Sequence, residues 1–277
     1  CCPRACKQSA ETMKLLILTA VSVICTVAAV PLMYWLTRRG NLVRPNFRGE
    51  EIPVGFGYLL VLSSLPAYFV AVWIWPQTSK EIMSFVFAIA VFGTLGLADD
   101  ICGSRSTGGF RGHFSQLLKG KVTTGAIKAI VGGAVALLIG SLIADSDARI
   151  GILNGLVIAL TANLLNLLDL RPGRAVSCYW LFLLAFALSR WDGSWSWWTV
   201  LPVLPAAVWL TGLDRRAKIM LGDAGSNVLG VVLGLAFAWN LGIASKLAVL
   251  AVLVLWLHRA NIGRLRAGTE PRVGSKS

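Results

Sequence analysis

The stretch EIMSFVFAIAVFGTLGLADD, residues 81–100, is an apolar run that ends in two aspartates. The run over 81–98 is close to the length of about 20 residues that a helix needs to cross a bilayer. Carboxylates at the edge of a bilayer are costly and are usually kept for a purpose. This stretch therefore predicts a membrane-spanning helix that carries functional acids at one end.

The whole chain has the composition of a membrane protein. Of its 277 residues, 56% are hydrophobic and 14% are charged, and the mean hydropathy is +0.71. A soluble domain is nearer about 45–50% apolar and about 25% charged. Because backbone groups in lipid must bond internally, we expect an all-α integral membrane protein, a polytopic bundle of about nine transmembrane helices. The expected spans are 14–36, 54–75, 81–98, 124–144, 150–168, 175–190, 196–212, 225–241 and 243–257.

The distribution of charge predicts how the bundle is oriented. The net charge is +13, but most of the 26 lysines and arginines follow odd-numbered spans, which argues against nucleic acid as a partner. The positive-inside rule then places these linkers and the C-terminus in the cytoplasm, as in a bacterial inner (plasma) membrane protein. Lys128 falls inside a span. We expect an N-terminal tail over 1–13, open to lying upstream of the native start, a single transmembrane domain over 14–257 and a basic cytoplasmic tail over 258–277.

Three polar clusters fall at the ends of spans, and the count of crossings puts all three on the cytoplasmic face. They are Asp99-Asp100, the series Asn163, Asn166 and Asp169, and Asp223 within Gly222-Asp223-Ala224-Gly225-Ser226. Residues three apart share a helix face, so the second series forms a polar stripe. Taken singly, each cluster could be a helix cap or a bond between helices. Together they predict an active site with oxygen ligands that suit Mg²⁺. The competing hypothesis is a cation transporter, which would instead need acids in the middle of its spans.

Basic residues on the same face could bind phosphate. Glycines interleave with them, which lets a diphosphate come close to the backbone. The alternative is that they only set topology and contact lipid headgroups. The candidate substrate-binding residues of this kind are Arg48, Arg111, His113 and Lys121.

At these residues the chain resembles the polyprenyl-phosphate N-acetylhexosamine-1-phosphate transferases. The resemblance rests on 48–53, 96–100, 163–169 and 218–230 and covers about 14–257, which would be the transferase domain. It implies a Mg²⁺-dependent transfer of a sugar-1-phosphate from a UDP-sugar to a membrane polyprenyl (undecaprenyl) phosphate, with release of UMP, for cell-envelope polymers such as peptidoglycan. By position, Asp223 looks like the metal ligand, and Asp99 and Asp100 look like the acids that position and deprotonate the acceptor phosphate or bind metal. Asn166, with Asn163, and the catalytic Asp169 look like parts of the nucleotide-sugar site.

The chain departs from that family at two places. Pro172 stands where the family often has a second acid after Asp169, and only His258 stands near its histidine-rich motif. These departures keep an alternative open, a catalytically weak or silent relative that acts as a membrane scaffold or regulator. They also leave the identity of the sugar open. A homodimer is compatible with the sequence.

Overall fold

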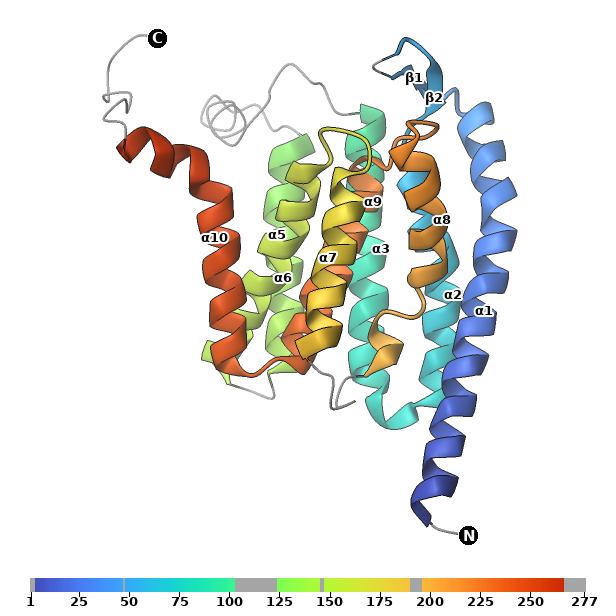
Figure 1. Ribbon diagram of the computed structural model, residues 1–277, viewed down its shortest axis with the longest axis vertical. Coiled ribbons are helices and arrows are strands. Elements are labelled where there is room, and N and C mark those ends of the chain that lie inside the picture. Colours follow the sequence, from blue (N-terminus) through green and yellow to red (C-terminus); the bar gives the residue numbers. More distant parts are fainter. Residues whose placement is uncertain (1–2, 47, 103–123, 145–146, 190–195, 267–277) are drawn as a thin grey trace.

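Helices make up most of the part of the chain that the structure describes. The computed structural model describes residues 3–46, 48–102, 124–144, 147–189 and 196–266 (Figure 1). Its helices are α1 (Pro3–Arg39), α2 (Leu59–Ile74), α3 (Ser79–Cys102), α5 (Thr124–Ile143), α6 (Ala148–Leu168), α7 (Arg174–Ser189), α8 (Leu204–Arg215), α9 (Gly222–Asn240) and α10 (Ile243–Arg266). Short 3₁₀ turns cover Phe56–Tyr58, Pro76–Thr78 and Trp197–Thr199. The antiparallel strands β1 (Val43–Pro45) and β2 (Glu51–Pro53) form a small hairpin at one end of the bundle.

The bundle is that of an all-α, multi-pass membrane protein, but the expected count of nine spans is not confirmed. Among the described residues, five helices are long and apolar enough to cross a membrane, and they include α3 and α6. Shorter apolar helices cover 127–143, 174–189 and 243–256. The expected span 196–212 is broken, because Pro202 and Pro205 delay the start of α8 until Leu204. A helix tolerates proline in its first turn but not in its interior.

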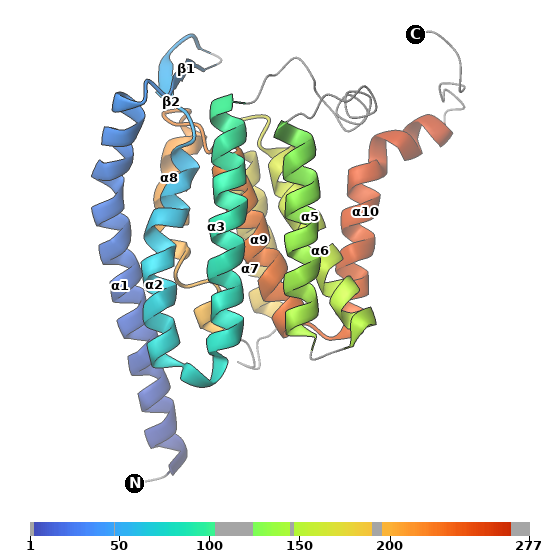
Figure 2. The ribbon, with the colours of Figure 1, turned by 180° about the vertical axis from the view of Figure 1, so that it is seen from behind.

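The helix α1 begins well before the expected first span. It runs from Pro3, so the described part of 1–13 is helical and continuous with the span. Figures 1 and 2 both show α1 at one edge of the bundle and α10 at the other edge. The buried Lys246 attaches α10 to the bundle, since its Nζ donates to Oδ1 of Asn154 on α6 at 2.7 Å.

At the centre lies α9, which packs against α6 and α3. In its most apolar window, 83% of the residues are buried and the mean hydropathy is only 1.2. Glycines allow the close approach that packing between membrane helices requires. A Cβ at Gly230 would lie 2.5 Å from the Ala162 Cα, and one at Gly96 would lie 2.5 Å from the Asp223 carbonyl oxygen. The position of α9 is thus fixed by backbone contact with both neighbours.

We expect Gly230→Ala to destabilise the bundle by about 1–3 kcal/mol, because the added methyl group has no room beside Ala162. Thermal unfolding of the purified protein in detergent would measure the loss. The matched control is Gly133→Ala on α5, where a Cβ meets nothing within 4 Å. The control should unfold at the wild-type temperature or slightly above it. Equal destabilisation by both substitutions would contradict the close packing of α9 against α6.

Candidate functional site

Three helix ends bring the predicted polar clusters together. The C-terminal ends of α3 and α6 and the N-terminal end of α9 lie at the same end of the bundle, beside the hairpin (Figure 1). These ends carry Asp99 and Asp100, Asn166 and Asp169, and Asp223, respectively. The sequence-based prediction that the clusters share one face of the bundle is confirmed.

The carboxylate of Asp100 joins α3 to the start of α9. It accepts hydrogen bonds from the backbone N–H groups of Asp223, at 2.8 Å, and of Ala224, at 3.0 Å. These N–H groups have no partner within their own helix, and the helix dipole favours a negative charge there. Gly222 is required beside this contact. Its φ is +71°, and a Cβ would lie 2.5 Å from Oδ2 of Asp100.

Asp223 is the hub of the side-chain contacts. Its Oδ2 forms an ion pair with the Lys128 ammonium of α5. The side chains of Asp99 and Asn166 also form hydrogen bonds with it. Asn166 in turn donates from Nδ2 to Oγ of Ser226 at 3.2 Å. One carboxylate thus connects four helices, α3, α5, α6 and α9.

Asp169 follows the last turn of α6 and faces the other acids of the site. Burial raises the pKa of its carboxyl well above its usual value, and the negative charges of Asp214, Asp223 and Asp100 raise it further. The N–H of Gly222 donates to it and partly opposes this rise. A carboxyl with a raised pKa exchanges a proton more readily near neutral pH, as a general base or acid must.

Asp214, at the end of α8, holds two loops of the site in place. The residue is 3% exposed, and its carboxylate accepts hydrogen bonds from the N–H groups of Gly173, at 2.7 Å, and Leu221, at 3.4 Å. Burial raises the pKa of this carboxyl, while the two N–H donors lower it. The loop over 169–173 and the loop over 217–221 are therefore tied to one buried group.

The hairpin supports the second of these loops from the other side. Segment 53–57 bonds to Met220 and Leu221, directly before α9 begins. The N–H of Met220 donates to Pro53 O at 2.8 Å, and those of Phe56 and Gly57 donate to Met220 O at 3.3 Å and Leu221 O at 3.0 Å. In addition, Nδ2 of Asn46 donates to Ala217 O at 3.1 Å. Arg44 on β1 also donates to the Asp100 carbonyl at 3.3 Å. The hairpin thus helps to place both Asp100 and the start of α9.

Not all of the predicted residues join the site. Asn163 is exposed on α6, so the expected stripe contributes only Asn166 and Asp169. Arg48 is exposed in the hairpin turn, where its backbone N–H donates to Oδ1 of Asn46 at 2.8 Å. The predictions for Arg111, His113 and Lys121 lie outside the described residues.

Sequence reasoning gave no site role to Lys128 and missed Asp214. Lys128 had a usable signal, because an ionisable residue inside an apolar span is a functional candidate by default. The sequence carries no such signal for Asp214, because this residue stands directly before Arg215 and Arg216 and looks like part of a charged linker. Its role depends on loop bonds that only the fold creates.

The magnesium site stays a prediction. The part of the chain that the structure describes contains no group of three or more His, Cys, Asp and Glu side chains arranged to hold a metal ion. Asp223, the expected ligand, bonds to Lys128, whose ammonium lies where a cation would compete.

Comparisons with known proteins find local similarity to bacterial acyltransferases. No known protein-family profile matches the chain. Glycerol-3-phosphate acyltransferase of Hyphomonas neptunium is 44% identical over 79 residues, which is 27% of this chain and 36% of that protein. The enzyme of the same name from Erythrobacter litoralis is 40% identical over 76 residues, 26% of this chain and 36% of that protein. The one from Rhizobium etli is 36% identical over 78 residues, 28% of this chain and 37% of that protein.

The chain thus spans about a third of the length of these curated relatives. The matches are local, and they recur in several bacteria under one name. The relatives named here are enzymes, acyltransferases by the function that their name prints.

These matches overturn the resemblance drawn from the sequence. The prediction of a polyprenyl-phosphate N-acetylhexosamine-1-phosphate transferase is wrong, because the relatives are named for acyl transfer to glycerol-3-phosphate. The same finding contradicts the predicted partners, UDP-sugar and undecaprenyl phosphate, and the predicted role in envelope polymers. It also removes the alternative of a silent relative of that transferase family. The physical reason is that Asp, Asn and Gly at helix ends mark a polar site at a membrane edge, without defining which bond is made there.

The raised pKa of Asp169 predicts a dependence of stability on pH. Below the unfolded-state pKa of about 3.9, the carboxyl is protonated in both the folded and the unfolded state. As the pH rises above that value, the unfolded state ionises first, so this residue lowers the free energy of unfolding. Asp169→Asn removes the effect. We expect its unfolding temperature to rise relative to wild type as the pH goes from about 4 to about 7.

Thermal unfolding in detergent over that pH series would test this expectation. Asp147→Asn is the control for loss of a carboxylate, because Asp147 is the exposed cap of α6 at the other end of the bundle. A constant difference between Asp169→Asn and wild type across the series would contradict the assignment.

Proposed function

We propose that this protein is a membrane enzyme that transfers an acyl group from an activated donor to a hydroxyl group of glycerol-3-phosphate. The observation that carries the proposal is the recurrent local similarity to bacterial glycerol-3-phosphate acyltransferases. A membrane-edge site supports it, because a soluble glycerol phosphate and an acyl chain can meet only at that boundary.

The charges around the site suit a phosphate-bearing acceptor. The two loops that Asp214 ties together, and the helix ends that flank them, carry exposed cations, which could hold a phosphate through charge-assisted bonds. These cations are Arg171, Arg174, Arg215, Arg216 and Lys218. We also propose that this end of the bundle faces the bacterial cytoplasm, which the same basic residues support.

We assign Asp169 as the general base of the reaction. The acceptor hydroxyl oxygen attacks the acyl carbonyl carbon and forms the new ester C–O bond. Its proton passes to the Asp169 carboxylate, and the bond from the acyl carbon to the leaving group breaks with its electron pair on that group. The neighbouring carboxylates raise the proton affinity of Asp169, and the Lys128 ammonium compensates the charge of Asp223.

The test uses the full chain in liposomes with radiolabelled glycerol-3-phosphate. An acyl thioester and an acyl phosphate serve as donors in separate reactions, and the extracted lipid product is counted. We expect a monoacylated glycerol phosphate from the wild type. Asp169→Asn should lower the rate by about 10²-fold or more, as loss of a general base does.

Asp147→Asn is the matched control, since it removes one carboxylate far from the site, and it should keep the wild-type rate. Undecaprenyl phosphate with a UDP-sugar is the comparison substrate pair. Acyl transfer by neither donor, or release of UMP from the comparison pair, would overturn the proposal. A wild-type rate for Asp169→Asn would overturn the assignment of the base alone.

A further inference from the structure

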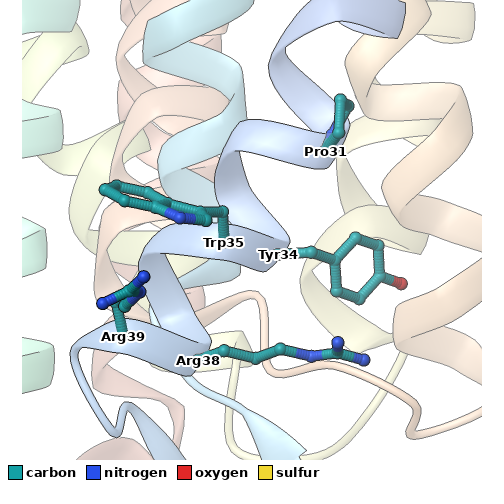
Figure 3. A pocket seen from close by; sticks show the side chains of 5 residues that line it. All are labelled: Pro31, Tyr34, Trp35, Arg38 and Arg39. Atoms are coloured by element: carbon teal, nitrogen blue, oxygen red, sulfur yellow. The ribbon is translucent and has the colours of Figure 1, made fainter.

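A groove on the outer side of α1 lies apart from the acidic site. Its volume is about 530 Å³. The lining residues follow one stripe of the helix, Pro31, Tyr34, Trp35, Arg38 and Arg39 (Figure 3). In that view, Tyr34 and Arg38 extend to one side of the helix and Trp35 and Arg39 to the other. The groove thus combines an apolar wall with two guanidinium groups.

The groove opens toward the surroundings of the bundle. Only 22% of the most apolar window of α1 is buried, the smallest share among the five candidate spans. Trp35 in the groove is exposed, and so are its helix neighbours Leu32 and Leu36. Large apolar side chains in such an exposed stripe suit contact with acyl chains.

The charge of the groove lies at the edge of the membrane span. Arg38 and Arg39 form the last turn of α1, where the span ends, and both are exposed. The Arg39 guanidinium lies 5.8 Å from the Trp35 ring centre, so an aromatic ring and a cation are joined at the level where lipid headgroups begin. None of the lining residues is acidic, so the groove favours an anion.

The inner wall of the groove is held in place by ring packing. The Tyr34 ring lies 4.8 Å from the Phe56 ring and 6.3 Å from the Trp209 ring, both edge to face. Pro31 lacks the N–H that would bond to the Val27 carbonyl within the helix. The wall is therefore shaped before any ligand arrives, which reduces the ordering cost of binding.

We propose that this groove binds one anionic phospholipid. The lipid phosphate lies at the end of the span where Arg38 and Arg39 carry their guanidinium groups, and an acyl chain lies along Pro31 and Trp35. Guanidinium groups bind phosphate oxygens in paired hydrogen bonds, and the apolar wall accepts the chain that a free phosphate lacks. This site is independent of the acyl transfer proposed above.

Native mass spectrometry of the full chain in detergent, titrated with phosphatidylglycerol, would test the site. We expect one lipid to be retained by the wild type. Arg38→Gln with Arg39→Gln should weaken retention by about fivefold for each arginine. Arg259→Gln is the matched control, because Arg259 also lies over a tryptophan ring, Trp256 on α10, at 4.4 Å. The control should retain lipid as the wild type does.

Two further comparisons separate the headgroup from the chain. The wild type should retain phosphatidylcholine, which carries no net charge, less than it retains phosphatidylglycerol. The double variant should retain the two lipids equally. Trp35→Ala should weaken retention of both lipids. Unchanged retention of phosphatidylglycerol by the double variant, equal loss with Arg259→Gln, or displacement of the lipid by equimolar inorganic phosphate would each overturn the proposal.

Discussion

The structure depends on one carboxylate that serves a helix other than its own. Asp100 ends α3, where the helix dipole disfavours an acid, yet its oxygens accept the first N–H groups of α9. The interaction therefore compensates two helix ends that would be unfavourable alone. Because α9 is the buried centre of the bundle, this contact sets where Asp223 meets Lys128 and Asn166.

The fold class and much of the site could be predicted from the sequence. Composition and apolar runs predicted a helical membrane protein, and the parity of the spans predicted that Asp100, Asp169 and Asp223 would meet. Periodicity placed Asn163 with them, but the residue is exposed, since neighbours in space decide which positions of a stripe are covered. The roles of Asp214 and the hairpin come from bonds between distant loops, which no local pattern encodes.

The chemistry was less predictable than the geometry. A group of acids at a membrane edge with cations around it suits any reaction in which a phosphate-bearing molecule meets a lipid. The motifs at 96–100 and 163–169 specify that setting, because they provide carboxylates and close helix approach. The identity of the reacting bond lies in substrate contacts and in residues that short motifs do not include. Similarity to named acyltransferases is instead the basis of the reaction that we propose.

The burial of α9 has a consequence for how the protein is made. A segment with a mean hydropathy of only 1.2 gains little from entering lipid alone, and its glycines and the polar Asn227 fit a protein surface better. Its two main partners, α3 and α6, precede it in the chain and are synthesised first. When α9 enters the membrane, α3 and α6 can therefore already be in place to pack against it. The order of the helices along the chain thus matches the order in which the bundle needs them.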